Sequence, residues 1–356
     1  MNDTGTSAGG GAKRAVLGVS LAVGALVVVL GTVFVVRQTL TGGPVEAGAT
    51  APGGTPASAL AIEEVLRSSR VFLNQGEFGK AGSLLASAVA NAPMDQDLRL
   101  AYAEALLGQR DAAGAHEQFV AAIAIGPDAP EIRFDAATVA NVAGLLEDAE
   151  EHYWQAQTLD PSDARYPLYL AQVQRKLNKP NEAKKNLLLA ANLDPTLDIA
   201  WGVLADLSLE ENKLSVARGH IGRAREIAPG SIPWRIIEAR IERRDNNPER
   251  ALALLMGLSP SERAHQPMAL REMALALGLM GRPAEAAELY ADASAMVTGD
   301  PLGEILCEAA QWYERAGMID EAIVYASRAA RAGDEAAGDL LDRLEETVRA
   351  DAAPGA

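Results

Sequence analysis

Cysteine, histidine and aromatic residues are scarce in this sequence. Cys307 is the single cysteine among 356 residues, so an internal disulfide and a cysteine-based zinc or iron–sulfur site are both excluded. None of the four histidines has a second candidate ligand at helical spacing, so we expect no bound metal and expect these side chains at the surface. The histidines are His116, His152, His220 and His265. Aromatic residues make up 4% of the chain against 49% hydrophobic residues, which predicts helices packed through alanine, leucine and valine rather than a β-sandwich.

Basic residues are also in the minority, and the usual sequence signatures of catalysis are missing. The 48 acidic and 32 basic residues give a net charge of −16, which argues against a general nucleic-acid binder. Gly79-Lys80 is followed by alanine and lacks the upstream glycine of a phosphate-binding loop. Cys307 has no catalytic motif around it, so we expect a partly buried, unreactive thiol. The sequence therefore predicts a protein that is not an enzyme and that uses no cofactor, metal or small-molecule substrate.

One long uncharged segment lies near the N-terminus. Residues 15–36 carry no charge and, as a helix, would span roughly 33 Å, close to the ~30 Å hydrocarbon core of a bilayer. A buried core helix is rarely apolar on every face at this length, and a cleaved signal peptide has a shorter apolar stretch of ~7–15 residues. We therefore expect an uncleaved, single transmembrane helix. Lys13 and Arg14 precede it and only Arg37 follows closely, so the positive-inside rule places residues 1–14 in the cytoplasm.

A linker follows this segment, and the composition of the chain indicates where the rest of the protein lies. Residues 37–58 contain five glycines and three prolines without hydrophobic periodicity, which predicts a flexible tether. The arginine-rich, alanine-rich composition suggests a bacterial source, so we expect an inner-membrane protein whose remaining residues lie in the periplasm.

The remaining sequence repeats with a period of 34 residues. Small side chains recur where two helix backbones must approach closely, and a bulky apolar side chain recurs where neighbouring hairpins leave a gap. Proline ends the second helix of each hairpin because it has no amide hydrogen to donate. The prolines are Pro93, Pro127, Pro161, Pro195 and Pro229. The small residues are Ala81, Ala115, Ala149, Ala183 and Ala217; Ala88, Ala122, Ala156, Ala190 and Ala224; and Ser69, Ala103, Ala137, Ala171 and Ala205. The bulky residues are Leu85, Phe119, Tyr153, Leu187 and Ile221, and turns inside the hairpins are expected at Gly76, Arg110, Gly144, Asn178 and Asn212.

This registered set of positions resembles the tetratricopeptide repeat. Five repeats counted from Ile62, Gln96, Pro130, Ala164 and Asp198 fit that family's small, bulky and proline positions. In the fifth, Trp201, Leu204 and Ala205 also match the family's opening motif. The resemblance implies an all-α fold, a right-handed superhelical solenoid of about eight helical hairpins. Its last, amphipathic segment would be a capping helix.

The predicted organisation has four parts. They are a short N-terminus (1–14), a transmembrane helix (15–36), a linker (37–58) and a solenoid (59–350). The repeats are expected near residues 62–95, 96–129, 130–163, 164–197, 198–231, 232–266, 267–302 and 303–334, with the cap at 335–350. Pro260 comes three positions early, so we expect the sixth hairpin to be shortened or distorted.

Positive charge is concentrated in the middle of the repeats. Residues 164–250 contain 15 basic and 11 acidic residues, a net charge of +4, so the rest of the chain carries −20. In the family, first-helix positions line a concave groove that binds peptides. Transferred to this sequence, they predict partner-binding residues at Arg165, Leu168, Gln172, Arg175, Lys176, Asp206, Arg240, Arg243 and Arg244. Ile199, Gly202, Leu209 and Ile236 hold further groove positions, and the isoleucines and the leucine are apolar spots.

The alternative is that these charges are solvated helix ends. In either case none holds a packing position of the repeat, so we expect Arg175, Arg240 and Arg243 to be reversible to glutamate without a loss of stability. The family's lysine-and-asparagine carboxylate clamp for chaperone tails is not reproduced here.

We therefore predict a non-catalytic, membrane-tethered scaffold or adaptor that binds protein partners in the groove, with acidic segments selected by the basic residues. A chaperone-like assembly factor, or an accessory subunit for envelope protein complexes, secretion or polysaccharide export, is the alternative. No nucleic-acid partner is expected.

Overall fold

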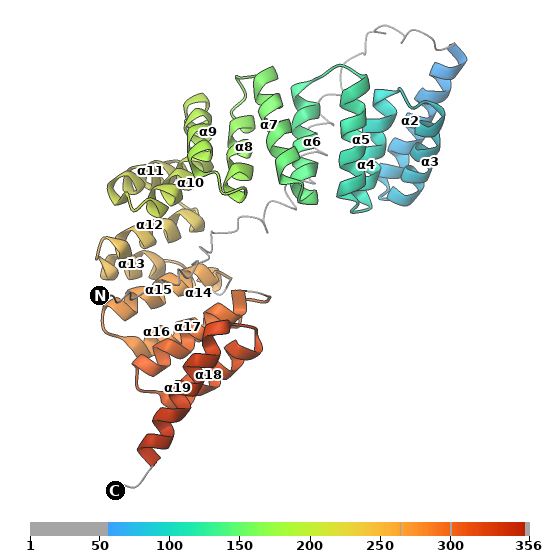
Figure 1. Ribbon diagram of the computed structural model, residues 1–356. Coiled ribbons are helices and arrows are strands. Elements are labelled where there is room, and N and C mark those ends of the chain that lie inside the picture. Colours follow the sequence, from blue (N-terminus) through green and yellow to red (C-terminus); the bar gives the residue numbers. More distant parts are fainter. Residues whose placement is uncertain (1–55, 264, 300, 353–356) are drawn as a thin grey trace, which may run out of the picture. The chain divides into compact units, whose positions relative to one another are not determined.

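The computed structural model describes residues 56–263, 265–299 and 301–352 of the chain. Within these residues it contains eighteen helices, α2 to α19, and no strands (Figure 1). The predicted N-terminus 1–14, the predicted transmembrane helix 15–36 and nearly all of the predicted linker 37–58 lie outside the described residues. In the described part of the chain, no helix combines the length and the apolar character needed to cross a bilayer.

The helices form two compact units, divided after Pro161. In the first unit, each helix packs against the next along the chain, as Figure 1 shows for the blue to green helices. Its helices are α2 (Pro56–Asn74), α3 (Phe78–Asn91), α4 (Gln96–Gly108), α5 (Ala112–Ile125), α6 (Pro130–Ala143) and α7 (Leu146–Leu159). The first of them begins at Pro56, so the last three residues of the expected linker are helical.

The second unit continues the same hairpin pattern. Its first six helices are α8 (Arg165–Lys176), α9 (Pro180–Leu193), α10 (Asp198–Glu210), α11 (Leu214–Ile227), α12 (Ile232–Arg244) and α13 (Pro248–Met256). The next six are α14 (Pro260–Arg263), α15 (Pro267–Leu279), α16 (Pro283–Ser294), α17 (Pro301–Arg315), α18 (Ile319–Arg331) and α19 (Glu335–Ala352). The last helix packs against α18.

The sixth hairpin is distorted, as its early proline predicts. α13 has 9 residues, whereas α9 and α11 have 14 each. Pro260 begins the separate one-turn helix α14, because its ring fixes a backbone angle suited to a first helical turn and cannot continue the preceding helix.

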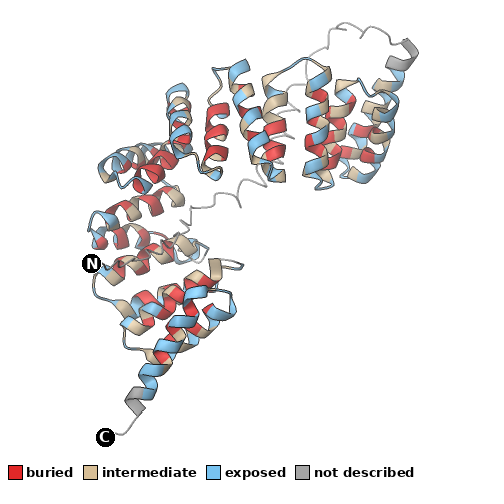
Figure 2. Ribbon diagram, in the orientation of Figure 1, coloured by how far each residue is buried: buried red, intermediate tan, exposed pale blue. Residues whose placement is uncertain are grey.

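The small-residue columns form the contacts between helices. Every alanine that these columns contribute is fully buried except Ala88, which is half-buried, and Ser69 is buried as well. The bulky column is buried in all five repeats, and Figure 2 shows buried residues on helices of both units. The predicted packing register is therefore confirmed for these positions.

The turns inside the hairpins have a left-handed residue where the sequence predicts a turn. Gly76 and Gly144 have φ angles of 73° and 80°, and Asn178 and Asn212 both have φ of 56°. Arg110 stands in the same conformation, with φ of 65°, although it has a Cβ that crowds the backbone there.

Candidate partner-binding surface

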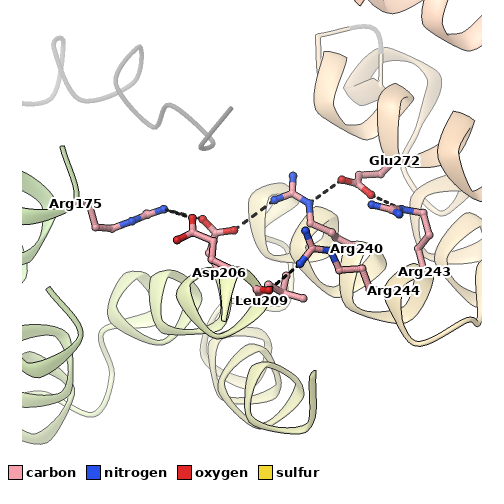
Figure 3. Close-up of polar contacts among 8 residues, drawn as sticks. Arg175, Asp206, Leu209, Arg240, Arg243, Arg244 and Glu272 are labelled. Atoms are coloured by element: carbon pink, nitrogen blue, oxygen red, sulfur yellow. Dashed lines mark hydrogen bonds and ion pairs between the residues drawn. The ribbon is translucent and has the colours of Figure 1, made fainter. Parts of the chain in front are cut away.

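Four of the predicted groove residues meet in one ion-pair cluster within the second unit (Figure 3). Arg175 comes from α8, Asp206 from α10, and Arg240 and Arg243 from α12. A fifth member, Glu272 of α15, was not singled out by the sequence. We call these five residues the arginine cluster. It connects the first helices of four successive hairpins.

The cluster is a chain of alternating charges. Arg175 Nη2 donates to Asp206 Oδ2 at 2.9 Å, and Arg240 Nη1 donates to the other carboxylate oxygen of Asp206 at 3.4 Å. Arg240 Nε donates to Glu272 Oε1 at 2.7 Å, while Arg243 Nε donates to Glu272 Oε2 at 2.8 Å. Each carboxylate therefore bridges two guanidinium groups, and Arg240 bridges both carboxylates.

The members of the cluster are largely withdrawn from solvent. The side chains of Glu272, Asp206 and Arg240 are 4%, 7% and 13% exposed. Burial alone would raise the pKa of Glu272, but attraction to Arg240 and Arg243 and their hydrogen bonds together lower it, so the carboxylate is charged at neutral pH. Removing either a carboxylate or a guanidinium group from such a site leaves a buried charge without its counter-charge.

Glu210 lies at the edge of the cluster. Its carboxylate is 3.5 Å from Arg175 Nη2 and is more exposed than those of Asp206 and Glu272. Burial and the neighbouring Asp206 raise the pKa of Glu210, and Arg175 only partly offsets them. The three arginines of the cluster thus face three carboxylates, so their charge is balanced locally.

Two further predicted cations flank the cluster and are exposed. Arg244 is exposed on α12, and its Nη1 donates to the backbone oxygen of Leu209 at 2.7 Å. Lys176 is exposed at the end of α8. These two side chains supply the accessible positive charge next to the arginine cluster.

The other predicted groove residues have different surroundings. Arg165 pairs with Asp163 at the start of α8, away from the C-terminal turn that holds Arg175. Gln172 is half-buried, and Leu168 is buried in the core formed by α8, α9 and α10. The repeat pattern did not indicate Asp163 as the partner of Arg165.

Of the expected apolar spots, Ile199 on α10 is exposed, whereas the others are covered. Leu209 and Ile236 are buried in the packing between repeats, as Leu168 is. Gly202 faces the ring of Trp234 from the next hairpin, so a side chain at this position would overlap that ring. These positions serve the core of the solenoid, because adjacent hairpins cover them.

The expectation that Arg175, Arg240 and Arg243 could all be reversed without a loss of stability is wrong. A glutamate in place of Arg240 would lie among the buried carboxylates of Asp206 and Glu272, with no cation to replace the lost charge. The repeat spacing shows which positions face a neighbouring helix backbone but does not show which charges lie opposite one another.

The histidines and the cysteine form no recognisable reactive site in the described residues. The expectation that all four histidines lie at the surface is wrong for His116 and His152, which are buried, and His220 is half-buried. No group of three or more potential metal-binding side chains occurs between residues 56 and 352, as far as the structure describes them. Cys307 is buried, and burial raises the pKa of its thiol to about 11, so the reactive thiolate is scarce at neutral pH.

Comparisons with known proteins identify the fold but no close relative. No family model matches the sequence, and no curated protein matches it either. A tetratricopeptide repeat protein from Parabacteroides merdae superposes with a TM-score of 0.59 at 15% identity, over 70% of this chain and 98% of that one. A chain of the APC/C hetero-tetramer Cut9-Hcn1 gives a TM-score of 0.56 at 11% identity, and yeast Tom70 gives 0.52 at 20%. These alignments cover 79% and 78% of this chain but only 55% of the matched chain of the hetero-tetramer and 60% of Tom70.

The repeat register, the buried small-residue columns and these superpositions agree with one another. The structural neighbours are repeat proteins built from helical hairpins, and the described residues of this chain form the same kind of array. The chain therefore has the tetratricopeptide-repeat fold.

Proposed function

We propose that this protein is a non-catalytic, membrane-tethered scaffold that binds a protein partner on the surface around the arginine cluster. The observation that carries the proposal is the convergence of Arg175, Asp206 and Arg240 from three successive hairpins, with the exposed cations Lys176 and Arg244 beside them. The buried ion pairs hold the surface in one arrangement. The flanking cations Lys176 and Arg244 are exposed, and their charge would attract an acidic partner.

The chemistry of this surface favours an acidic partner segment. The charges inside the arginine cluster are balanced, so selectivity for acidic groups would come from Lys176 and Arg244. An exposed ion pair contributes modestly, about 0.5–1 kcal/mol, so binding would also need contacts along several hairpins. The similar fold of a chain in the APC/C hetero-tetramer Cut9-Hcn1 supports a role in protein assembly.

Membrane tethering is the second part of the proposal. It rests on the uncharged run of residues 15–36 and on the excess of positive charge before it. The repeats would then lie in the periplasm of a bacterium, held away from the membrane by the linker 37–58.

The partner-binding surface can be tested with a pair of matched double variants. Lys176→Glu with Arg244→Glu reverses the exposed cations beside the cluster, whereas Lys185→Glu with Arg223→Glu reverses two exposed cations on the second helices α9 and α11. After crosslinking in the native membrane and affinity purification, the first variant should lose the main partner and the second should retain it. Circular dichroism should show that both remain helical.

Three results would argue against this binding mode. Equal recovery of the partner by both double variants would place the binding surface elsewhere. Binding that does not weaken between ~0.05 and ~0.5 M salt would exclude exposed ion pairs as the source of selectivity. Many substoichiometric clients, instead of one partner at a fixed ratio, would indicate an assembly factor.

The tether is tested independently. A reporter that is active only outside the cytoplasm, fused after Ala356, should be active, and deletion of residues 1–36 should release the protein from the membrane fraction. A reporter active only in the cytoplasm should be silent at the same position. The reverse pattern would contradict the proposed orientation.

A further inference from the structure

Two buried histidines meet in the first unit, outside the proposed partner-binding surface. His116 of α5 and His152 of α7 have ring centroids 5.6 Å apart in an edge-to-face arrangement. They are 6% and 9% exposed. The Nε2 atom of His116 is buried without a hydrogen-bond partner.

Arg133 of α6 determines the protonation state of His152. Its guanidinium is held by Asp128 through two hydrogen bonds, Nε to Oδ1 at 2.7 Å and Nη2 to Oδ2 at 2.8 Å. Its Nη1 lies 3.3 Å from His152 Nδ1. Because a guanidinium can only donate, Nδ1 must accept, and His152 must be neutral with its hydrogen on Nε2.

The surroundings of His152 disfavour the charged ring. Burial lowers its pKa, and the positive charge of Arg133 and the neighbouring His116 lower it further. Asp148, one turn earlier on the same helix, and a hydrogen bond with Gln155 both raise the pKa of His152 but do not reverse the shift. Asp128 also faces this group, but it is already paired with Arg133.

The preceding repeat makes the same contact with a side chain that does not titrate. Arg99 and Gln118 stand 34 residues before Arg133 and His152, and Arg99 Nη1 donates to Gln118 Oε1 at 3.1 Å. The repeat architecture therefore accepts glutamine at this position, and the histidine adds a dependence on pH.

We propose that His152 is a pH-responsive contact whose protonation separates Arg133 from α7 and loosens α5, α6 and α7 in mildly acidic conditions. A proton on Nδ1 would face the N–H of Arg133, so the hydrogen bond between the two helices would be replaced by repulsion. When the segment opens, His152 regains its ordinary pKa of 6.5 and takes up a proton. Opening is therefore favoured as the pH falls below 6.5, and the closed state is most stable above that pH.

Hydrogen exchange on the full-length protein tests this proposal. The exchange rates are first corrected for the intrinsic pH dependence of exchange and then give the equilibrium constant for local opening of α5–α7. This constant should rise by up to about tenfold per pH unit below pH 6.5, because one proton is taken up on opening. The variant His152→Gln should remove this dependence, because glutamine can still accept from Arg133 as Gln118 does from Arg99. The control His265→Gln alters an exposed histidine and should keep it.

Nitrogen-detected spectra of the imidazole rings in the wild-type protein give a second test that needs no variant. At pH 7.5, His152 should be neutral with its hydrogen on Nε2. A hydrogen on Nδ1, or a ring that is already charged at this pH, would overturn the proposal. An equal pH dependence of hydrogen exchange in α5–α7 for the wild-type protein and the His152→Gln variant would also overturn the proposal.

Discussion

Glu272 has the least exposed carboxylate of the arginine cluster, and two guanidinium groups hold it in place. Surface ion pairs in the same unit, such as Arg282 with Glu285, have similar distances but stay hydrated. Because water weakens the attraction between these exposed side chains, the pair contributes little to the free energy of unfolding. At the scale of a single residue, burial rather than distance decides how much a charge matters to stability.

The variant Glu272→Gln tests this difference. It keeps the shape of the side chain but leaves Arg240 and Arg243 without their shared counter-charge, so we expect a loss of about 3 kcal/mol in the free energy of unfolding. Glu285→Gln should cost less than about 0.5 kcal/mol. Because the pKa of Glu272 lies below its ordinary value of 4.5, its stabilising effect should be complete above that pH and fade as the pH falls further. Equal denaturation midpoints for the two variants would contradict this role.

Gly202 and Gly219 offer a second comparison of single residues. A Cβ on Gly202 would overlap the ring of Trp234, which is buried and donates from Nε1 to Asp198 Oδ2 at 2.7 Å. Gly202→Ala should therefore cost about 1–3 kcal/mol by overpacking. Gly219, in the middle of α11, has no heavy atom near its would-be Cβ, so Gly219→Ala should stabilise by about 0.5–1 kcal/mol. Chemical denaturation measures the change in the free energy of unfolding for each variant, and the two changes should have opposite signs.

At the scale of the element, each hairpin depends on a left-handed turn residue. Glycine and asparagine adopt this conformation at low cost and fill the turn in most hairpins. Arg110 adopts this conformation between α4 and α5, although its side chain is exposed and has a Cβ that crowds the backbone there. The turn between the two helices of the hairpin therefore requires the left-handed conformation even where the residue is an arginine, which adopts it at a cost.

Replacing Arg110 with asparagine should relieve this strain. We expect Arg110→Asn to stabilise the protein by about 0.5–1 kcal/mol, because asparagine enters the left-handed region more readily. Asn178→Arg, the reverse change at the corresponding turn between α8 and α9, should destabilise by a similar amount. Shifts in the same direction for both variants would show that the turn conformation is not the cause.

At the scale of the whole molecule, the helices depend on their neighbours along the chain. Within the second unit, α9 contacts α8 and α10, and α18 contacts α17 and α19. Stability in such an array is a sum of repeat and neighbour contributions, so a local defect need not unfold distant repeats.

The variant Ala183→Leu should show this locality. Ala183 is fully buried on α9, so the larger side chain should cost about 1–3 kcal/mol by overpacking. Hydrogen exchange should become faster in α8–α10 while the protection of α17–α19 is unchanged. Lys185→Leu places the same side chain on the exposed face of α9 and should leave both regions protected. A uniform loss of protection through α19 would indicate a single cooperative unit instead.

The repeat pattern was sufficient to predict the helices, the buried columns and the turn positions. Ala183 and Ala205 could be assigned to helix contacts because a small side chain is required wherever two backbones approach, and that requirement recurs every 34 residues. The left-handed turns followed from Gly76 and Asn178 for the same local reason.

Charge pairing and burial were decided only by the tertiary structure. The repeat register assigned Arg240, Arg175 and Asp206 to groove positions but gave no sign of Glu272, whose bond to Arg240 joins residues 32 positions apart across the distorted sixth hairpin. His152 was expected at the surface, yet α5 and α6 cover it. The sequence by itself determined which positions repeat, because backbone packing has a fixed period. Only the structure decided which side chains meet, because that depends on how successive hairpins stack.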